Sequence, residues 1–341
     1  MKSEIRVTGG RWQVTGTGSR AAYRVTRHVS RVTGFTLVEI LVTMVLLSLI
    51  VLALMTVFNS TQKAFRASLT QTDLLESGRL AMGLMVSDLE GMAPSLQPVN
   101  TTVPFWYLRA TDPYSTNNNV NFFAAVTTFA SPPSPLYQSL VGVNNPNTQR
   151  TNVLESFFSL SRQNINGRPN WVGTGYLVNT NAQDGALYPL YRFYMTTNAI
   201  SGTPASLYNA FFSTSPTNSP PWSHLMDGVV SLRVRAYTPN GFWVTNTYPF
   251  YNGWPATNDN VYNLPSSYGG YGEIGFIMYS NTVPASVEVE LGVLEDAVLK
   301  RAESFNGNLL AQTNYLVQHV GQVHLFRQRV LIRNVDPTAY Q

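Results

Sequence analysis

Cysteine is absent from the sequence of 341 residues, and charged residues make up only 12% of it. Without cysteine the chain has neither a disulfide framework nor a thiolate metal site. It also contains no P-loop and no Gly-x-Ser-x-Gly sequence, which are signatures of nucleotide binding and of a serine nucleophile. We therefore expect a protein that is not an enzyme and that uses no cofactor.

The few charges are unevenly distributed along the chain. Residues 1–33 carry seven basic side chains against one acid, Glu4, so the net charge of this tail is +6. Because the whole chain sums to +4, all other residues together carry a net charge of −2. The basic character belongs to the tail, and the body of the protein is not expected to bind nucleic acid.

One apolar run is long enough to cross a membrane. The nineteen residues from Ile40 to Phe58 carry no charge, and about 20 helical residues span the hydrocarbon core of a bilayer. The arginines before the run favour a cytoplasmic N-terminus. We expect a bacterial inner-membrane protein that contacts lipid through residues 35–58 and crosses once, with its C-terminal head in the periplasm. A secretory signal peptide is disfavoured, because its apolar region has only about 7 to 15 residues and a small-x-small cleavage site follows it.

A single acid, Glu39, lies at the start of this apolar segment. A charged carboxylate is costly at the centre of a bilayer and less costly near the headgroups, where a helix N-terminus also favours an anion. Cleavage between Gly34 and Phe35 would create an α-amino group, with a pKa of about 8, four residues from this carboxylate. That amine, or the one of a neighbouring subunit, would give Glu39 a cationic partner.

The stretch GFTLVE, residues 34–39, with the apolar run behind it resembles the processing and assembly motif of type IV pilins and type II secretion pseudopilins. The resemblance implies that prepilin peptidase cleaves after Gly34 and methylates Phe35, and that Glu39 pairs with an N-terminal amine during assembly. It also implies other pilin-like subunits and an inner-membrane assembly platform as partners, and a location in a periplasmic or cell-surface filament. Residues 1–34 would be the cleaved leader, which is long for this family.

The same helix is predicted to continue through residues 59–93. This segment contains no proline, and apolar residues recur in it at spacings of three and four, which place them on one helical face. Pro94 is predicted to end the helix. We interpret the face as one that packs on a soluble head, in preference to a cofactor site. Its members are Leu75, Gly78, Met82, Met85, Leu89 and Met92.

Residues 94–341 are predicted to form a β-rich head. Residues 229–238 and 285–294 alternate apolar and polar side chains, with Val230, Leu232 and Val234 on one apolar face. Arginines and glutamates on the two polar faces predict that these strands are neighbours. Further strands are expected in FFAAVTTFA, FFSLSR, LYPLYRFYM, GFIMYS and LFRQRVLIR.

A late amphipathic helix is expected near residues 294–309, with an interruption expected at Gly307. The prolines and asparagines of the connections favour antiparallel pairing. The expected fold class is therefore α+β, a pilin-like fold in which a long N-terminal helix packs on an antiparallel β head.

Three further stretches, residues 74–92, 224–243 and 281–296, resemble the J-type minor pseudopilin and the W-type minor pilin. The ending, residues 323–341, resembles protein C of a pilin-like cassette of verrucomicrobial genomes. These resemblances imply a minor pseudopilin of a type II secretion-like or type IV pilus-like filament. Two alternatives stay open: a minor type IV pilin for adhesion or DNA uptake, and a periplasmic binding protein or enzyme held by an uncut signal anchor.

No metal site is predicted. His319 and His324 are five residues apart, which misses the spacing of four that places two ligands on one helix face. The stretch around Asp259 contains oxygen ligands suited to calcium but lacks the spaced acids of a calcium loop, so an asparagine-rich turn is favoured.

Overall fold

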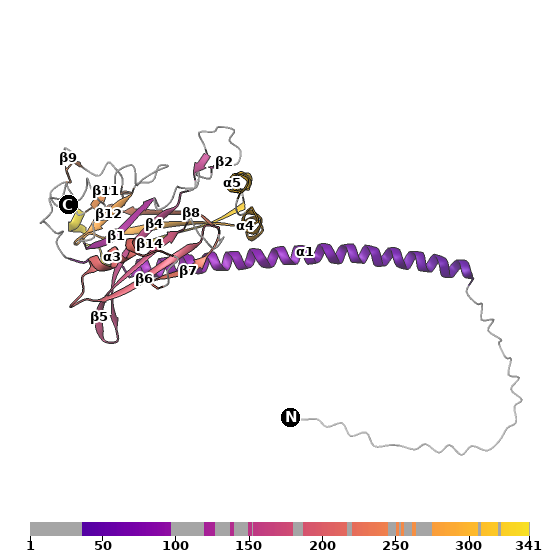
Figure 1. Ribbon diagram of the computed structural model, residues 1–341, viewed down its shortest axis with the longest axis horizontal. Helices are drawn as coiled ribbons and strands as arrows, with labels where there is room; N and C mark the ends of the chain where they lie inside the picture. Colours follow the sequence, from indigo (N-terminus) through magenta and orange to yellow (C-terminus); the bar gives the residue numbers. More distant parts are fainter. Residues whose placement is uncertain are drawn as a thin grey trace, which may run out of the picture. The chain divides into compact units, whose positions relative to one another are not determined.

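A computed structural model (Figure 1) gives the fold of the parts of the chain described here. The described residues are 36–96, 119–126, 137–139, 149–151, 153–179, 187–216, 220–244, 250–251, 254–255, 261–263, 275–305, 308–319 and 322–340. The chain divides into two compact units, Met1–Gln62 and Lys63–Gln341. A single helix, α1 (Leu37–Glu90, 54 residues), contributes to both.

Helix α1 ends earlier than the predicted limit at residue 93. Its last residue is Glu90, and the chain then turns at Gly91. Met92 forms an antiparallel bridge with Ser161, and the amide of Ala93 donates to the carbonyl of Leu160 at 2.9 Å. The backbone groups after the helix are therefore satisfied by a sheet before Pro94 is reached.

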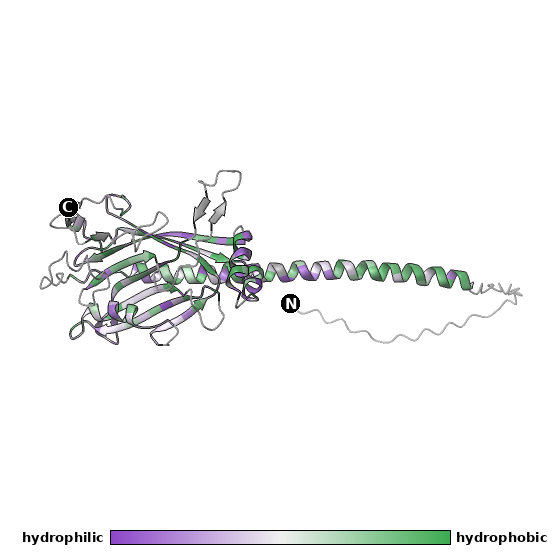
Figure 2. Cartoon of the chain, turned by 45° about the horizontal axis from the view of Figure 1, so that its top comes forward, coloured by the Kyte–Doolittle hydropathy of each residue, from purple (hydrophilic) through white to green (hydrophobic). Residues whose placement is uncertain are grey.

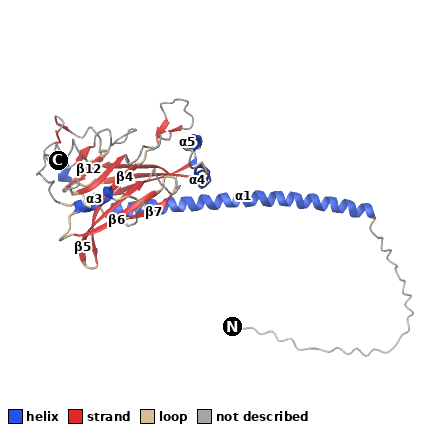
Figure 3. Ribbon diagram, viewed as in Figure 1, coloured by secondary structure: helices blue, strands red, loops and turns tan. Residues whose placement is uncertain are grey.

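The head is built from antiparallel sheets, drawn in red in Figure 3. The larger one has seven strands in the order β11-β12-β1-β4-β5-β6-β7, and a second has three in the order β14-β13-β8. Together with α1, this confirms the α+β, pilin-like fold class. The seven strands are β1 (Val120–Val126), β4 (Glu155–Ile165), β5 (Arg168–Val178), β6 (Leu190–Asn198), β7 (Trp222–Met226), β11 (Val261–Asn263) and β12 (Phe276–Tyr279). The three strands are β8 (Val229–Tyr237), β13 (Ser286–Leu294) and β14 (Val323–Leu331). Two small ribbons pair β2 (Tyr137–Ser139) with β3 (Gln149–Thr151), and β9 (Phe250–Tyr251) with β10 (Trp254–Pro255).

The late helical region consists of two helices, α4 (Asp296–Glu303) and α5 (Leu309–Gln318). Leu294 is the last residue of β13 and does not belong to a helix. The break lies in the region where the interruption was expected, although Gly307 itself is outside the described residues. Asn308 is the N-cap of α5, and its side-chain oxygen accepts a hydrogen bond from the amide of Ala311 at 3.1 Å.

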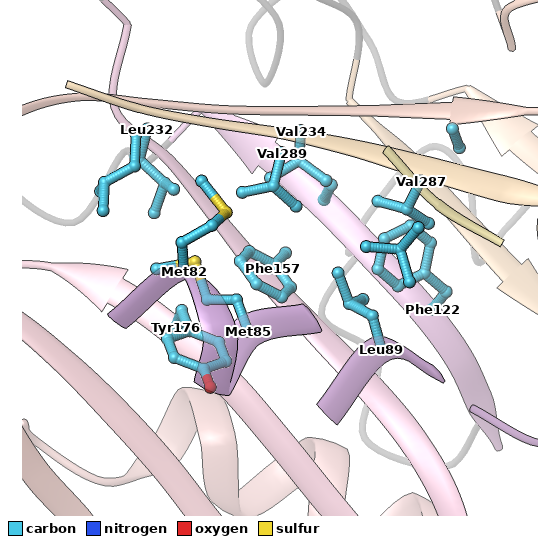
Figure 4. Close-up of a cluster of buried hydrophobic side chains, with 14 of the residues drawn as sticks. Met82, Met85, Leu89, Phe122, Phe157, Tyr176, Leu232, Val234, Val287 and Val289 are labelled. Atoms are coloured by element: carbon cyan, nitrogen blue, oxygen red, sulfur yellow. The ribbon is translucent and has the colours of Figure 1, made fainter. Parts of the chain in front are cut away.

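The main core lies between the two sheets, with the last turns of α1 inside it (Figure 4). Met82, Met85 and Leu89 point from the helix toward apolar side chains of both sheets, and all three are buried. Phe157 and Tyr176 come from the seven-stranded sheet. The methionine-containing stripe is therefore a packing face, as interpreted from its spacing, although at its start the core contains Leu74 and not the predicted Leu75.

Strands β8 and β13 are neighbours, as their charge patterns predicted. Contrary to the prediction, Val230 does not share a face with Leu232 and Val234. Gly292 of β13 pairs with Ser231 and Val293 pairs with Val229, so the register shifts between these two pairs and Val230 lies in a bulge. It packs in a separate buried cluster with Val298 of α4, whereas Leu232 lies in the main core. A bulge moves a side chain to the opposite face of a strand in this way.

A second, aromatic-rich core packs the seven-stranded sheet against helix α3 (Pro204–Ser213). Phe211 of α3 lies with its ring 5.7 Å from that of Phe158 and 5.6 Å from that of Phe193. The short helix η3 (Pro337–Tyr340) follows β14, and the Tyr340 hydroxyl donates to the carbonyl of Val283 at 2.6 Å. The last residues of the described chain are thereby fastened to the head.

Candidate processing and assembly site

The N-terminal turn of α1 contains Glu39, one of the three residues assigned to processing and assembly. Gly34 and Phe35 lie outside the described residues. The Glu39 carboxylate accepts from the Thr36 amide at 2.9 Å and from the Thr36 hydroxyl at 3.0 Å. The Thr36 hydroxyl in turn lies 3.3 Å from the Glu39 amide, which donates to it. The reciprocal arrangement is a capping box, which satisfies two amides at a helix N-terminus that have no partner within the helix.

The capping box gives Glu39 a role within its own chain. The Thr-x-x-Glu spacing of residues 36–39 is the sequence signal for it, a signal separate from the charge pairing predicted for Glu39. The Thr36 amide lies on the C-terminal side of the predicted cleavage position, so cleavage between residues 34 and 35 leaves this partner in place. The carboxylate is exposed in the single chain, which leaves it accessible to a further cationic group.

The segment after Glu39 is apolar on all sides and exposed. Its most apolar window has a mean hydropathy of 2.9 and none of it is buried within the protein. Figure 2 shows this apolar stretch in green along α1. The hydroxyls of Thr43, Ser48 and Thr56 donate to carbonyls within the helix at 2.8 to 2.9 Å, so these polar side chains do not need water. The helix is long and apolar enough to cross a membrane.

Near the other end of α1, Asp88 links the helix to the seven-stranded sheet. Its two carboxylate oxygens each accept from the guanidinium of Arg192 on β6 at 2.8 Å. One of them also accepts from the hydroxyl of Tyr176 on β5 at 2.6 Å. Two parallel N–H bonds from an arginine fix both distance and orientation. The cluster therefore holds α1 in one rotation against the sheet.

The chemistry of this cluster follows from its partial burial. Burial raises the pKa of the Tyr176 hydroxyl, and the charge of Asp88 and its hydrogen bond raise it further. Burial alone would lower the pKa of Arg192, but the hydrogen bonds and charge of Asp88 outweigh this and raise it above its ordinary value. Tyr176 and Arg192 therefore keep their protons and remain hydrogen-bond donors to the Asp88 carboxylate. The cluster has a structural role.

The residues weighed as metal ligands are not brought together. His319 follows α5, where its Nδ1 atom lies 2.8 Å from the Tyr315 carbonyl, whereas His324 belongs to β14. Within the described parts of the chain, no group of three or more histidine, aspartate or glutamate side chains has the arrangement of a metal site. Asp259 lies outside those parts.

Comparison with known proteins identifies the N-terminal segment. Residues 29–55 match the family described as "Prokaryotic N-terminal methylation motif", the signature of type IV pilins and pseudopilins. No curated protein and no solved structure matches the chain. The matched segment covers Glu39 and the predicted cleavage position.

Motif and fold together define a class of protein. The motif supports a type IV pilin-like or pseudopilin precursor that prepilin peptidase processes and that assembles with other pilin subunits. The apolar helix that continues from it fits a membrane-anchored, filament-associated protein. The same motif favours a structural role over an enzymatic one.

Proposed function

We propose that this chain is a minor pseudopilin, a structural subunit of a type II secretion-like or type IV pilus-like filament. The observation that carries the proposal is the continuity of one element. Helix α1 begins at Leu37, within the segment that matches the methylation motif, and continues to Glu90, and its last turns lie in the core of a β head. A single helix thus contains Glu39 and the apolar segment and ends inside a folded head.

Three residues carry the processing and assembly steps of the proposal. Prepilin peptidase cleaves after Gly34 and methylates the amine of Phe35, and residues 1–34 are lost as the leader. The Glu39 carboxylate then pairs with the N-terminal amine of its own or a neighbouring subunit. Residues 35–58 contact lipid until an inner-membrane assembly platform moves them into the filament, while residues 59–93 carry the head of residues 94–341.

Three exposed apolar side chains on one side of α1 support packing between subunits. Phe65, Leu69 and Leu80 are 63%, 48% and 68% exposed. At 3.6 residues per turn they share one face of the helix, roughly opposite to the buried side chains of Met82 and Met85. Apolar side chains that are exposed on a helix with one face already packed are suited to contact with another helix.

The subtype rests on resemblance alone. Residues 74–92, 224–243 and 281–296 resemble the J-type minor pseudopilin and the W-type minor pilin, and residues 323–341 resemble the verrucomicrobial cassette protein C. The W-type resemblance keeps a minor pilin for adhesion or DNA uptake as the second candidate. Removing the gene separates the two, because a pseudopilin is needed for secretion of an enzyme and a minor pilin for surface pili or DNA uptake.

The N-terminus of the protein extracted from membranes tests the proposal. Terminal sequencing and intact mass should show that residues 1–34 are missing and that Phe35 carries one methyl group. Gly34→Leu should leave the precursor uncut. Glu39→Gln should be cut normally but fail to enter filaments, while Asp73→Asn, which changes an exposed acid further along α1, should assemble.

An intact N-terminus in cells that contain prepilin peptidase would contradict the proposal. The protein would then be a signal-anchored periplasmic binding protein or enzyme. Filament entry of Glu39→Gln at the normal level would remove the charge pair from the proposal but leave the cleavage step intact.

A further inference from the structure

The outer face of the three-stranded sheet carries alternating charges in two rows. Glu288 of β13 lies between Arg235 of β8 and Arg329 of β14. In the next row, Glu290 lies between Arg233 and Arg327. Each acid is thus flanked by two arginines across neighbouring strands, and the face has twice as many cations as anions.

The accessible charge of this face is positive. The side chains of Glu288 and Glu290 are only 13% and 11% exposed, whereas Arg327 is 58% exposed although it pairs with Glu288 at 2.6 Å. The guanidinium of Arg329 lies 4.0 Å from the centre of the Tyr237 ring and donates to the Ser286 hydroxyl at 2.9 Å. These contacts hold the arginines in place before any partner arrives, which lowers the entropy cost of binding.

Strand β14 forms one edge of the same sheet. Among the described strands, only β13 pairs with it. The carbonyl of Gln322 accepts from Glu295, and the amide of Ile332 donates to Ala285. Because backbone direction alternates along a strand, the even-numbered residues between them bond to β13 and the odd-numbered ones point their amides and carbonyls away from the sheet. The odd-numbered residues include Arg327 and Arg329, so the basic side chains belong to positions whose backbone groups pair with no other described strand.

A second copy of β14 is a poor partner for this edge. Full overlap of two antiparallel copies places Arg327 opposite Arg327, and like charges directly opposite each other destabilise a pair of strands. Leu325 and Leu331, which are 43% and 74% exposed, flank the arginines on the same face. An edge that carries cations resists pairing with itself and selects a strand of opposite charge.

We propose that the free edge of β14 binds an extended acidic segment of a partner protein as an additional strand. Its backbone pairs with residues 323–331, and carboxylates at alternate positions lie beside Arg327 and Arg329. Main-chain hydrogen bonds supply affinity and the alternating carboxylates supply specificity, as in other cases of strand addition. The inference concerns the head alone and needs neither cleavage after Gly34 nor filament formation.

A synthetic peptide tests the proposal on the full chain in detergent micelles. The probe is a fluorescent nine-residue peptide that alternates glutamate with threonine, and the control alternates lysine with threonine. The acidic peptide should bind and the basic one should not. On binding, hydrogen exchange should slow at the amides of Leu325, Arg327 and Arg329, whereas the amides of Phe326 and Gln328, which already bond to β13, should change little.

Methylated peptides separate strand pairing from charge attraction. One peptide carries N-methyl groups on the amides of its glutamates and the other on those of its threonines. If the peptide adds as a strand, one of these sets abolishes binding and the other preserves it. Equal binding of both sets, or absence of binding by the acidic peptide, would overturn the proposal.

A matched pair of arginine variants tests whether the peptide binds at β14. Arg327→Gln should weaken binding of the acidic peptide about fivefold. Arg168→Gln, which removes an exposed arginine at the start of β5, should leave the affinity unchanged. Equal weakening by both variants would mean that only the overall charge of the chain matters, and the assignment to β14 would fail.

Discussion

At the scale of single residues, the partly buried ion pair of Asp88 and Arg192 is predicted to stabilise the fold. The Asp88 and Arg192 side chains are only 11% and 20% exposed, so neither partner is fully solvated when the other is removed. Asp88→Asn should therefore lower the free energy of unfolding by about 1–3 kcal/mol. Urea unfolding of the full chain in detergent, followed by tryptophan fluorescence, measures this change.

The exposed pair between Asp296 and Lys300 on α4 is a suitable control. Its atoms are 2.6 Å apart, but the Lys300 side chain is 69% exposed. Surface pairs of this kind contribute little, because water and salt screen them. Asp296→Asn should change the stability far less than Asp88→Asn, and equal effects would show that burial does not set the strength of the Asp88 cluster.

The Asp88 cluster was not found from the sequence, for a physical reason. Tyr176 and Arg192 are 88 and 104 residues away along the chain, and only the pairing of β5 with β6 brings them to the same place. Glu39 shows the opposite case. Its capping partner is three residues away, and the spacing alone contains that information.

At the scale of elements, two glycines of α1 should respond oppositely to the same substitution. A Cβ atom at Gly78 would lie 2.3 Å from the ring of Phe326 on β14, whereas at Gly83 it would meet nothing within 4 Å. Gly83→Ala should stabilise the protein by up to about 1 kcal/mol, because alanine favours a helix. Gly78→Ala should instead destabilise it by about 1–3 kcal/mol, because the crowding outweighs that gain.

Thermal unfolding followed by circular dichroism measures whether Gly83→Ala stabilises the protein and Gly78→Ala destabilises it. Phe326→Leu removes the ring that the Gly78→Ala methyl group meets, so the double variant should lose less stability than the sum of the single variants. Stabilisation by Gly78→Ala alone would mean that the helix moves away from β14 without cost.

Sequence reasoning found elements that have a regular pattern or an apolar run. Strands β8 and β13 alternate apolar and polar residues except at the bulge near Val230, and the buried face of α1 repeats every three or four residues. Strands β1 and β12 overlap the apolar runs FFAAVTTFA and GFIMYS. Strand β5 was missed because glycines interrupt its pattern. A Cβ at Gly173 would lie 2.9 Å from Leu207, and one at Gly175 would lie 2.5 Å from Phe211, so α3 requires these glycines. Helix α3 was also missed, since it is short and depends on its aromatic contacts with the sheet.

At the scale of the whole molecule, the partly buried Tyr188 and the buried Tyr279 make stability depend on alkaline pH. Burial raises the pKa of Tyr188 to about 12, and it raises the pKa of Tyr279 as well. In the unfolded chain a tyrosine loses its proton near pH 10. The stabilising effect of Tyr188 is therefore complete below about pH 10 and is lost as the pH rises toward about 12.

Urea unfolding at about pH 9 and about pH 11.5 measures this loss. Tyr188→Phe removes the titrating group. Between the two pH values, the free energy of unfolding of this variant should therefore fall by about 2 kcal/mol less than that of the unmodified protein. An equal fall in both proteins would show that Tyr188 ionises as readily in the folded state as in the unfolded one.

Substitutions at exposed and at buried apolar positions of α1 should affect assembly and folding differently. Phe65→Gln and Leu80→Gln change exposed positions and keep a good helix former, so the unfolding temperature of the isolated protein should stay the same. Met85→Ala removes a side chain that is fully buried in the main core and should lower the free energy of unfolding by about 2–5 kcal/mol.

If Phe65 and Leu80 contact the helix of a neighbouring subunit, their variants should be cleaved and folded normally yet fail to appear in sheared filament fractions. Arg79→Gln, which changes an exposed charge on the same helix, should assemble like the unmodified protein. Normal assembly of both glutamine variants would mean that this face of α1 meets only solvent in the filament, and that subunits associate through the segment before residue 59 or through their heads.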